Sequence, residues 1–517
     1  MLKKEIIIAL IICIAAHLLA EEGMGYHYKV NSVIKKEASN TKNDIFLKLK
    51  STEDSATIIL DDFTAIYLIE YSHKLLFSDY VDQELPEISV AFKSLSSTTK
   101  LINGQEERVI TSIEKINPNA AGSDYFYNYQ SLKPGIPEKD FHHRYVRVPV
   151  DYTNPELGSF DLYYELCSDY DESKPTVIIP TDGQRTFSQV GMADDYKEMF
   201  GLEYNTVTYE YRGMYASAIP QLSGREIDWN LACEILKSEN VVKDIERIRR
   251  DLLGDEKVYI LGGSGTAMMG MKYVANYPDK VKKAFLMSFF KDARGSSEAG
   301  VTFFSNFLEE NKLLSAYKKI INQKIVDQHQ LLFLIQRLLY YDKDIARNMI
   351  LELDEKKKEL YEKYTEQLGT VDFFIRSAQK YKPWSVVFMY ETNIRTSLNG
   401  LPDINYPFYE MGTPVRKARG NQMDDLFDIE NLDQVKTDVL LVAGTLDQVA
   451  PVSELKRIHD QLPNSKLAIF EAYHCLQASE ESKQCRSDLA NTFFKSGEIQ
   501  SYLDSSGTDC NFIKLLN

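Results

Sequence analysis

Short apolar runs recur at long intervals after residue 140, and they restrict the possible fold more than any other feature. They are residues 176–179, 206–209, 258–261, 284–287, 439–442 and 467–470. Continuous apolar runs of this length are typical of strands covered on both faces, as in a parallel sheet. Two further strand candidates, residues 145–150 and 160–164, precede them and flank the turn signals Asn154-Pro155 and Gly158.

Helical patterns separate several of these runs. Residues 241–253 carry apolar side chains at helical spacing, at Val242, Ile245, Ile248 and Leu252. Strand–helix alternation of this kind predicts an α/β fold with a mostly parallel, doubly wound sheet.

Residues 295–425 break the alternation. This interval is charged, rich in helix formers and far longer than an ordinary crossover. We expect a helical insertion over the carboxyl edge of the sheet, where ligands bind in open α/β folds. The alternative is a solvated helical bundle that makes no substrate contact.

The run at 258–261 leads directly into Gly262-Gly263-Ser264-Gly265-Thr266, and helix-compatible residues follow. A sharp strand-to-helix turn strains the backbone at its central residue and needs small neighbours. It exposes the hydroxyl and directs the following N–H groups at a developing oxyanion. Ser264 is therefore the candidate nucleophile, with the backbone of Gly265 as an oxyanion donor. A phosphate-binding turn is the alternative, but neither the Rossmann spacing nor a P-loop lysine is present.

A serine nucleophile needs a base, and the base needs an orienting carboxylate. Asp447 follows the run at 439–442, and His474 follows the run at 467–470. Their order after Ser264, nucleophile then acid then histidine, is the one expected on a sheet of this kind. We therefore predict the triad Ser264, Asp447 and His474.

The N-terminus has the pattern of a secretory signal over residues 1–20. Lys3 and Lys4 precede an apolar stretch from Ile6 to Leu19, which is short for a membrane span. We expect a secreted or periplasmic protein without a stable membrane span after signal removal; an uncleaved anchor is the alternative. Residues 21–140 contain strand-like runs at 45–49 and 56–60, which indicate an α+β extension of unknown role.

Composition and charge exclude several classes of protein. Hydrophobic residues make up 44% and charged residues 26%, which is ordinary globular usage. The net charge of −16 without a basic cluster argues against a nucleic-acid partner. No Cys/His spacing indicates a metal, and no cofactor is expected.

Of the cysteines beyond the signal, Cys485 and Cys510 are the preferred disulfide. Because five cysteines remain after the signal, at least one is unpaired or bonded elsewhere.

Over residues 143 to 510 the chain resembles the proline iminopeptidase and tripeptidyl aminopeptidase family of α/β-hydrolases. The matching segments are residues 148–152 with Asn154-Pro155, Tyr211-Arg212-Gly213, residues 244–250, residues 273–281, Gly444-Thr445-Leu446-Asp447 with Pro451, His474 and the late cysteines. The resemblance implies an α/β-hydrolase core at 141–294 and 426–517, a lid at 295–425, and a peptide or amide substrate with a free amino terminus.

The sequence departs from this family at one loop. Where the family carries a His-Gly-Gly-Pro-Gly-like segment that helps to form the oxyanion hole, residues 180–185 read Pro-Thr-Asp-Gly-Gln-Arg. An aspartate there is unfavourable near a developing negative charge. In the lid, Glu391 is the carboxylate to test for binding a substrate ammonium; a solvated helix position is the alternative.

Three functions follow from these patterns. The first is a serine hydrolase that cleaves short peptides through an acyl-enzyme. The second is a carboxylesterase or lipase-like hydrolase, because the same triad serves esters. The third is a binding protein of the same fold without turnover, which the altered loop permits. No sequence feature indicates the oligomeric state.

Overall fold

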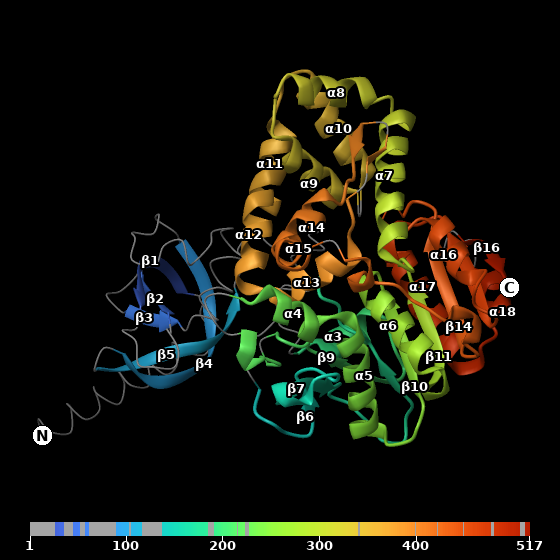
Figure 1. Ribbon diagram of the computed structural model, residues 1–517, viewed down its shortest axis with the longest axis horizontal. Helices are drawn as coiled ribbons and strands as arrows, with labels where there is room; N and C mark the ends of the chain where they lie inside the picture. Colours follow the sequence, from blue (N-terminus) through green and yellow to red (C-terminus); the bar gives the residue numbers. More distant parts are fainter. Residues whose placement is uncertain are drawn as a thin grey trace, which may run out of the picture. The chain divides into compact units, whose positions relative to one another are not determined.

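The computed structural model forms two compact units, residues 1–136 and 137–517 (Figure 1). The predicted boundary at residue 140 is close to this division. The structure describes residues 26–35, 45–51, 57–60, 89–102, 105–115, 137–184, 191–214, 216–222, 227–339, 342–395, 397–398, 400–420, 422–447, 449–476, 480–506 and 512–517. The predicted signal at 1–20 lies outside these residues.

The described strands of the first unit close into a barrel. They are β1 (Tyr26–Lys35), β2 (Ile45–Ser51), β3 (Thr57–Leu60), β4 (Ser89–Ile102) and β5 (Gln105–Lys115), in the order β1-β2-β3-β5-β4. β1 pairs antiparallel with both β2 and β4, while β3 and β5 pair in parallel. Closure gives each of these strands a partner on both sides over part of its length. The strands predicted at 45–49 and 56–60 are confirmed as β2 and β3.

The second unit is built on a nine-stranded sheet in the order β16-β15-β14-β11-β10-β8-β9-β7-β6. Pairing is parallel from β9 through β15, and β7 pairs antiparallel with both β6 and β9. The strands are β6 (His143–Pro149), β7 (Ser159–Leu166), β8 (Thr176–Ile178), β9 (Asn205–Tyr209), β10 (Val258–Gly263), β11 (Val281–Met287), β14 (Asp438–Gly444), β15 (Ser465–Phe470) and β16 (Phe512–Leu516). Every strand predicted after residue 140 is confirmed.

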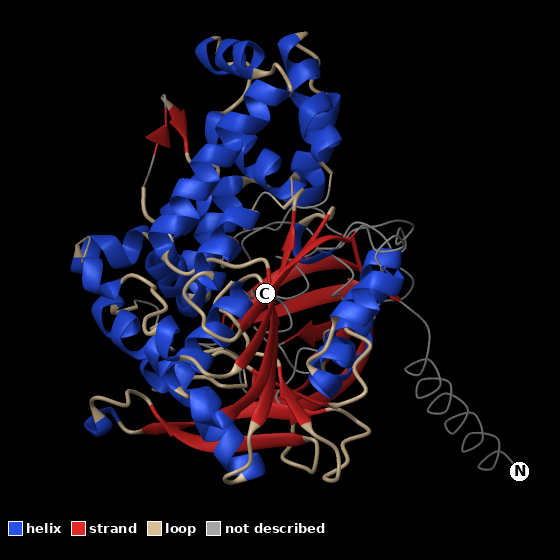
Figure 2. Cartoon of the chain, turned by 90° about the vertical axis from the view of Figure 1, so that its right-hand side faces the viewer, coloured by secondary structure: helices blue, strands red, loops and turns tan. Residues whose placement is uncertain are grey.

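Helices lie on both sides of this sheet (Figure 2). They are α3 (Met192–Met199), α4 (Trp229–Leu236), α5 (Ser238–Leu253), α6 (Gly265–Asn276), α16 (Val452–His459), α17 (Glu480–Ser496) and α18 (Gln500–Ser506). The periodic side chains Val242, Ile245 and Ile248 of α5 are fully or almost fully buried in the main hydrophobic core. Short 3-10 helices occupy Pro155–Leu157, Pro220–Leu222, Pro278–Lys280, Met423–Asp425, Leu432–Gln434 and His474–Leu476.

The predicted helical insertion is confirmed, and its helices stand together at one end of the sheet (Figure 1). It comprises α7 (Ala293–Glu310), α8 (Leu314–Asn322), α9 (Gln328–Leu338), α10 (Lys343–Asp354), α11 (Glu359–Leu368), α12 (Val371–Tyr381), α13 (Pro383–Thr392), α14 (Tyr406–Met411) and α15 (Thr413–Arg419), with a small hairpin of β12 (Ser397–Leu398) and β13 (Leu401–Pro402). Asp292, Asp327, Asp342 and Thr370 cap the first turns of α7, α9, α10 and α12.

The insertion has two kinds of packing. Side chains from α7 through α10 form a hydrophobic cluster of their own, around Phe304, Leu332 and Met349. Helix α13 instead buries Trp384 and Phe388 in the main core. α13 is therefore an integral part of the core that carries the sheet. Within the described part of the chain, no helix combines the length and the apolar character that a membrane span requires.

Candidate active site

Ser264 occupies the turn between β10 and α6. Its backbone has φ 59° and ψ −131°, a left-handed conformation that a serine adopts only when its surroundings impose it. Its N–H donates to the carbonyl oxygen of Met287 at 2.9 Å. A methyl group on Gly262 would lie 2.8 Å from the backbone nitrogen of Ala267, so only glycine fits there. The side chain of Ser264 is half-buried.

Thr266 departs from the glycine usual in such turns, and its contacts explain why it is accommodated. Its Oγ1 donates to the carbonyl oxygen of Gly263 at 2.8 Å and accepts the N–H of Gly263 at the same distance. The hydroxyl therefore fastens the last residue of β10 to the first turn of α6.

The structure brings Asp447 and His474 together, as predicted from their positions after β14 and β15. His474 Nδ1 lies 3.0 Å from each carboxylate oxygen of Asp447, and both side chains are buried. Asp447 Oδ1 also accepts the backbone N–H groups of Val449 and Ala450, at 2.9 Å each. A methyl group on Gly444 would overlap the carbonyl oxygen of Ala472, so the two turns are in backbone contact.

Electrostatics at this pair favour a protonated imidazole. Burial lowers the pKa of His474, but the Asp447 charge and hydrogen bond more than offset it, and the pKa is raised well above its ordinary value.

The turn that carries His474 contacts the Ser264 elbow. A methyl group on Gly263 would lie 2.9 Å from Cys475 Sγ. Cys475 N–H donates to Ser288 Oγ at 2.9 Å, and Ser288 directly follows the residue that binds the Ser264 N–H. The three predicted triad residues thus lie on turns at the carboxyl ends of β10, β14 and β15.

The loop after β8 packs directly against Gly265. A methyl group on Gly265 would lie 2.5 Å from Asp182 Oδ2 and 2.7 Å from Gln184 Nε2. The carboxylate expected to be unfavourable is therefore beside the residue predicted to supply the oxyanion donor. The closeness of Gln184 to Gly265 was not predicted from the sequence, because only the tertiary contact reveals it.

The interpretation of Glu391 as a solvated helix residue is wrong. Glu391 is 2% exposed, and its carboxylate accepts the N–H of Ser238 at 3.1 and 3.2 Å and the Ser238 hydroxyl at 3.1 Å. Burial first, and then the Glu239 charge, raise its pKa to about 8. The carboxylate binds the first turn of α5, where the unpaired N–H groups of a helix favour an acceptor.

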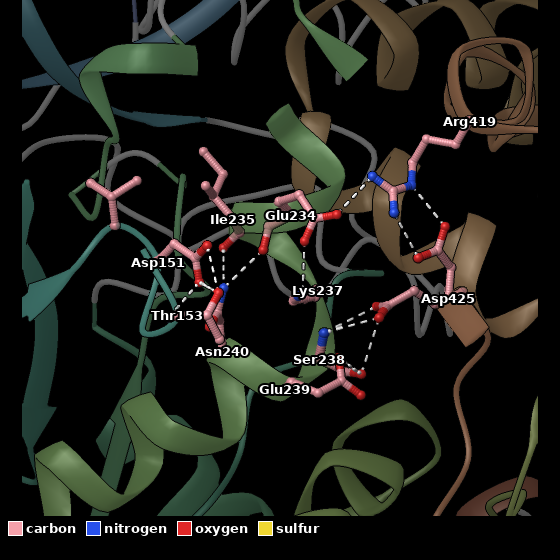
Figure 3. Close-up of polar contacts among 12 residues, drawn as sticks. Asp151, Thr153, Glu234, Ile235, Lys237, Ser238, Glu239, Asn240, Arg419 and Asp425 are labelled. Carbon is pink, nitrogen blue, oxygen red and sulfur yellow. Dashed lines mark hydrogen bonds and ion pairs between the residues drawn. The ribbon is translucent and has the colours of Figure 1, made fainter. Parts of the chain in front are cut away.

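A second contact fastens the insertion to the core nearby. Arg419 at the end of α15 reaches Glu234 of α4 at 2.8 Å and Asp425 at 2.8 Å (Figure 3). Glu234 also pairs with Lys237 at 2.7 Å. Together with Glu391 and Ser238, these pairs join the C-terminal ends of α13 and α15 to the junction of α4 and α5.

Several segments that carried the family resemblance meet in one buried network. Arg212 donates to both carboxylate oxygens of Asp244, at 2.7 and 2.8 Å, and to the carbonyl oxygen of Val150 at 2.7 Å. Tyr152 Oη donates to Asp244 at 2.9 Å. These residues join β6, β9 and α5, so the resemblance in this region reflects the architecture of the sheet rather than the chemistry of the site.

The described cysteines are either disulfide-bonded or free and buried. Cys485 is disulfide-bonded, and Cys510, its predicted partner, lies outside the described residues. Cys167, Cys233 and Cys475 are free and buried. Among the residues that the structure describes, His, Cys, Asp and Glu nowhere gather in a group of three or more that could hold a metal ion.

Comparisons with known proteins match both halves of the second unit. Residues 158–320 match the model of the α/β-hydrolase fold, and residues 421–510 match the model of the TAP-like protein family. A search of curated proteins gave no significant match.

Many solved structures are similar to this chain. A proline iminopeptidase from Mycobacterium smegmatis is 14% identical, with 69% of this chain and 100% of that chain covered and a TM-score of 0.35. MGS-M2, an α/β-hydrolase enzyme from a Medee basin deep-sea metagenome library, is 14% identical over 66% and 96%, with a TM-score of 0.38. A meta-cleavage product hydrolase from Pseudomonas fluorescens IP01 is 15% identical over 65% and 96%, with a TM-score of 0.35.

A mostly parallel sheet, a strained turn after β10 and acidic and basic side chains after later strands define the α/β-hydrolase class. The family models agree with this architecture. The chain is a member of the α/β-hydrolase superfamily, and residues 421–510 are similar to the TAP-like protein family.

Proposed function

We propose that the protein is a serine hydrolase in which Ser264 is the nucleophile, His474 the general base and Asp447 the residue that orients the base. The observation that carries this proposal is the contact of His474 Nδ1 with both oxygens of Asp447, at 3.0 Å, on turns beside the strained Ser264 elbow. Because Nδ1 faces the carboxylate, we assign Nε2 to proton exchange with the nucleophile.

The reaction proceeds in two halves. Ser264 Oγ forms a bond to the substrate carbonyl carbon while its proton passes to His474 Nε2. The carbon–nitrogen bond then breaks, and the leaving amine takes that proton, which leaves an acyl-enzyme. Water adds to the acyl carbon and gives a proton to His474, which returns it to Ser264 Oγ as the acid product departs.

The surroundings of Asp447 suit this role. Its Oδ1 accepts two backbone N–H groups in addition to its contact with the imidazole. These donors fix the position of the carboxylate beside the imidazole. A fixed negative charge beside Nδ1 stabilises the imidazolium that forms when Ser264 loses its proton.

The proposed substrates are short peptides with a free amino terminus. The match of residues 421–510 to the TAP-like model supports this class, as does the resemblance of the chain to aminopeptidases. Short acyl esters are the alternative substrates, because the triad and elbow serve both. Glu391 is engaged by Ser238 and buried, so we do not assign it to the substrate ammonium.

A binding protein without turnover is the second candidate, and a specific observation favours it. Asp182 Oδ2 packs against Gly265, where a negative charge opposes the charge that develops in acyl transfer.

The proposal that the protein is exported to an oxidising compartment rests on the signal-like N-terminus and on the disulfide at Cys485.

A fluorophosphonate probe tests the proposal directly. We expect covalent labelling of the wild-type protein and none of Ser264→Ala. Equal labelling of both, or no labelling of the wild type, contradicts a serine hydrolase. A panel of aminoacyl and peptidyl amides beside short acyl esters then separates the two substrate classes; turnover of esters alone excludes the peptidase.

A further inference from the structure

The loop after β8 brings two side chains to the same point on the Ser264 elbow. The position of a methyl group on Gly265 would be 2.5 Å from Asp182 Oδ2 and 2.7 Å from Gln184 Nε2. Gly265 directly follows Ser264 and begins α6, where the first N–H groups of the helix are available to an external acceptor. Gln184 therefore lies beside the residue whose backbone N–H is the candidate oxyanion donor.

Two contacts hold the loop in this position. Asp182 Oδ1 accepts the backbone N–H of Gln184 at 2.7 Å, which closes a tight turn around Gly183. A methyl group on Gly183 would overlap the Phe388 side chain and approach the Trp384 carbonyl oxygen at 3.0 Å. Because Trp384 and Phe388 are buried in α13, the turn is held between the elbow and the insertion.

The charges at this point decide which end of the Gln184 amide faces the elbow. Asp182 Oδ2 lies against the same Gly265 position, and a carboxylate oxygen repels an amide oxygen but attracts an amide N–H. An amide nitrogen carries two N–H groups, so one can face the carboxylate while the other faces a substrate oxygen. A carboxylate itself has no proton to donate and cannot fill that role.

We propose that the side-chain amide of Gln184 is the second oxyanion donor, together with the backbone N–H of Gly265, and that Asp182 is a positioning residue for it. This inference rests on the proposed serine hydrolase function. It replaces a loop backbone donor by a side chain, and it gives the departure of residues 180–185 from the family pattern a catalytic use. It also explains why a carboxylate is tolerated beside the hole, since Asp182 fixes the turn and orients the amide.

The rate of phosphonylation by a fluorophosphonate measures this donor. Ser264 Oγ bonds to phosphorus, fluoride leaves, and the serine proton passes to His474. Negative charge builds on the phosphoryl oxygen in the transition state, so an oxyanion donor accelerates the step. We expect Gln184→Ala to lower the second-order labelling rate about 10²- to 10³-fold, the usual effect of losing one such donor.

Gln184→Met keeps the length of the side chain without a donor, and it should lose as much. The exposed Gln434 provides the matched control, and Gln434→Ala should label at the wild-type rate. With any substrate that turns over, Gln184→Met should lower kcat and leave KM within about twofold, because the donor acts mainly in the transition state. Thermal unfolding checks that each variant is folded.

The outcomes distinguish this inference from the proposed function. Labelling of wild type with equal rates for Gln184→Ala and Gln184→Met overturns the role of Gln184 and leaves the serine hydrolase intact. A loss confined to KM also overturns it. Absence of wild-type labelling overturns the proposed function, and the oxyanion role with it.

Discussion

His474 Nδ1 lies 3.0 Å from both carboxylate oxygens of Asp447, whose Oδ1 is further held by the N–H groups of Val449 and Ala450. The carboxylate is thus fixed from both sides in a buried site. Asp447→Asn keeps the size of the side chain but removes the charge and permits the wrong imidazole tautomer. We expect the fluorophosphonate labelling rate to fall about 10³- to 10⁴-fold.

The exposed Asp433→Asn is the matched control, since it removes one charge from the surface and should leave the rate unchanged. Asp447→Asn with a rate within tenfold of wild type would show that His474 is oriented without the carboxylate.

The pH dependence of labelling reports on the same pair. A general base acts only when it is neutral, so labelling should rise with pH through the pKa of His474. Burial lowers this pKa, but the Asp447 charge more than offsets burial, and the net pKa is well above 6.5. The midpoint of the rise in wild type is therefore expected above pH 6.5, and Asp447→Asn should move it to lower pH. A midpoint unaffected by Asp447→Asn contradicts the assignment.

The strands and the polar turns that follow them could be predicted from the sequence because both signals are local. The run at 439–442 is continuous and apolar, so it indicated a covered strand, and Asp447 follows it within a few residues. The same reasoning placed His474 after β15. The glycines around Ser264 predicted a strained turn, and the positive φ of Ser264 confirms it.

Other features depend on contacts between distant segments, and the sequence alone did not reveal them. Gln184 meets Gly265 only because β8 and β10 are neighbours in the sheet. Helix α13 is apolar around most of its surface, so no period marked Glu391 as buried. β4 at Ser89–Ile102 is rich in Ser and Thr, and its polar character hid a barrel strand.

The charge of Asp182 can be separated from its hydrogen bond. Asp182→Asn retains an oxygen to accept the Gln184 N–H, while it removes a negative charge beside Gly265. We expect phosphonylation to become about tenfold faster, which corresponds to about 1.4 kcal/mol in the barrier. Asp182→Ala should instead slow the reaction, because the turn around Gly183 loses its acceptor. A slower Asp182→Asn would show that the charge itself assists the reaction.

Glu391 predicts how the stability of the second unit depends on pH. Its pKa is raised to about 8 in the folded protein, against 4.5 for a free glutamate, first by burial and then by Glu239, while Lys272 and Ser238 oppose the shift. Between pH 4.5 and 8 the folded state therefore binds more protons at this site than the unfolded state. The stabilisation that protonated Glu391 contributes is complete below pH 4.5 and is lost as the pH rises through about 8. The free energy of unfolding therefore falls with rising pH.

Glu391→Gln removes this titration while keeping an oxygen for Ser238. We expect its free energy of unfolding, relative to wild type, to rise between pH 5 and 8 by up to about 1.4 kcal/mol per pH unit. Urea unfolding followed by tryptophan fluorescence measures it, because both tryptophans, Trp229 and Trp384, lie in the second unit. The exposed Glu430→Gln should parallel wild type at every pH. Parallel curves for wild type and Glu391→Gln would show that Glu391 is ionised in the folded protein throughout this range.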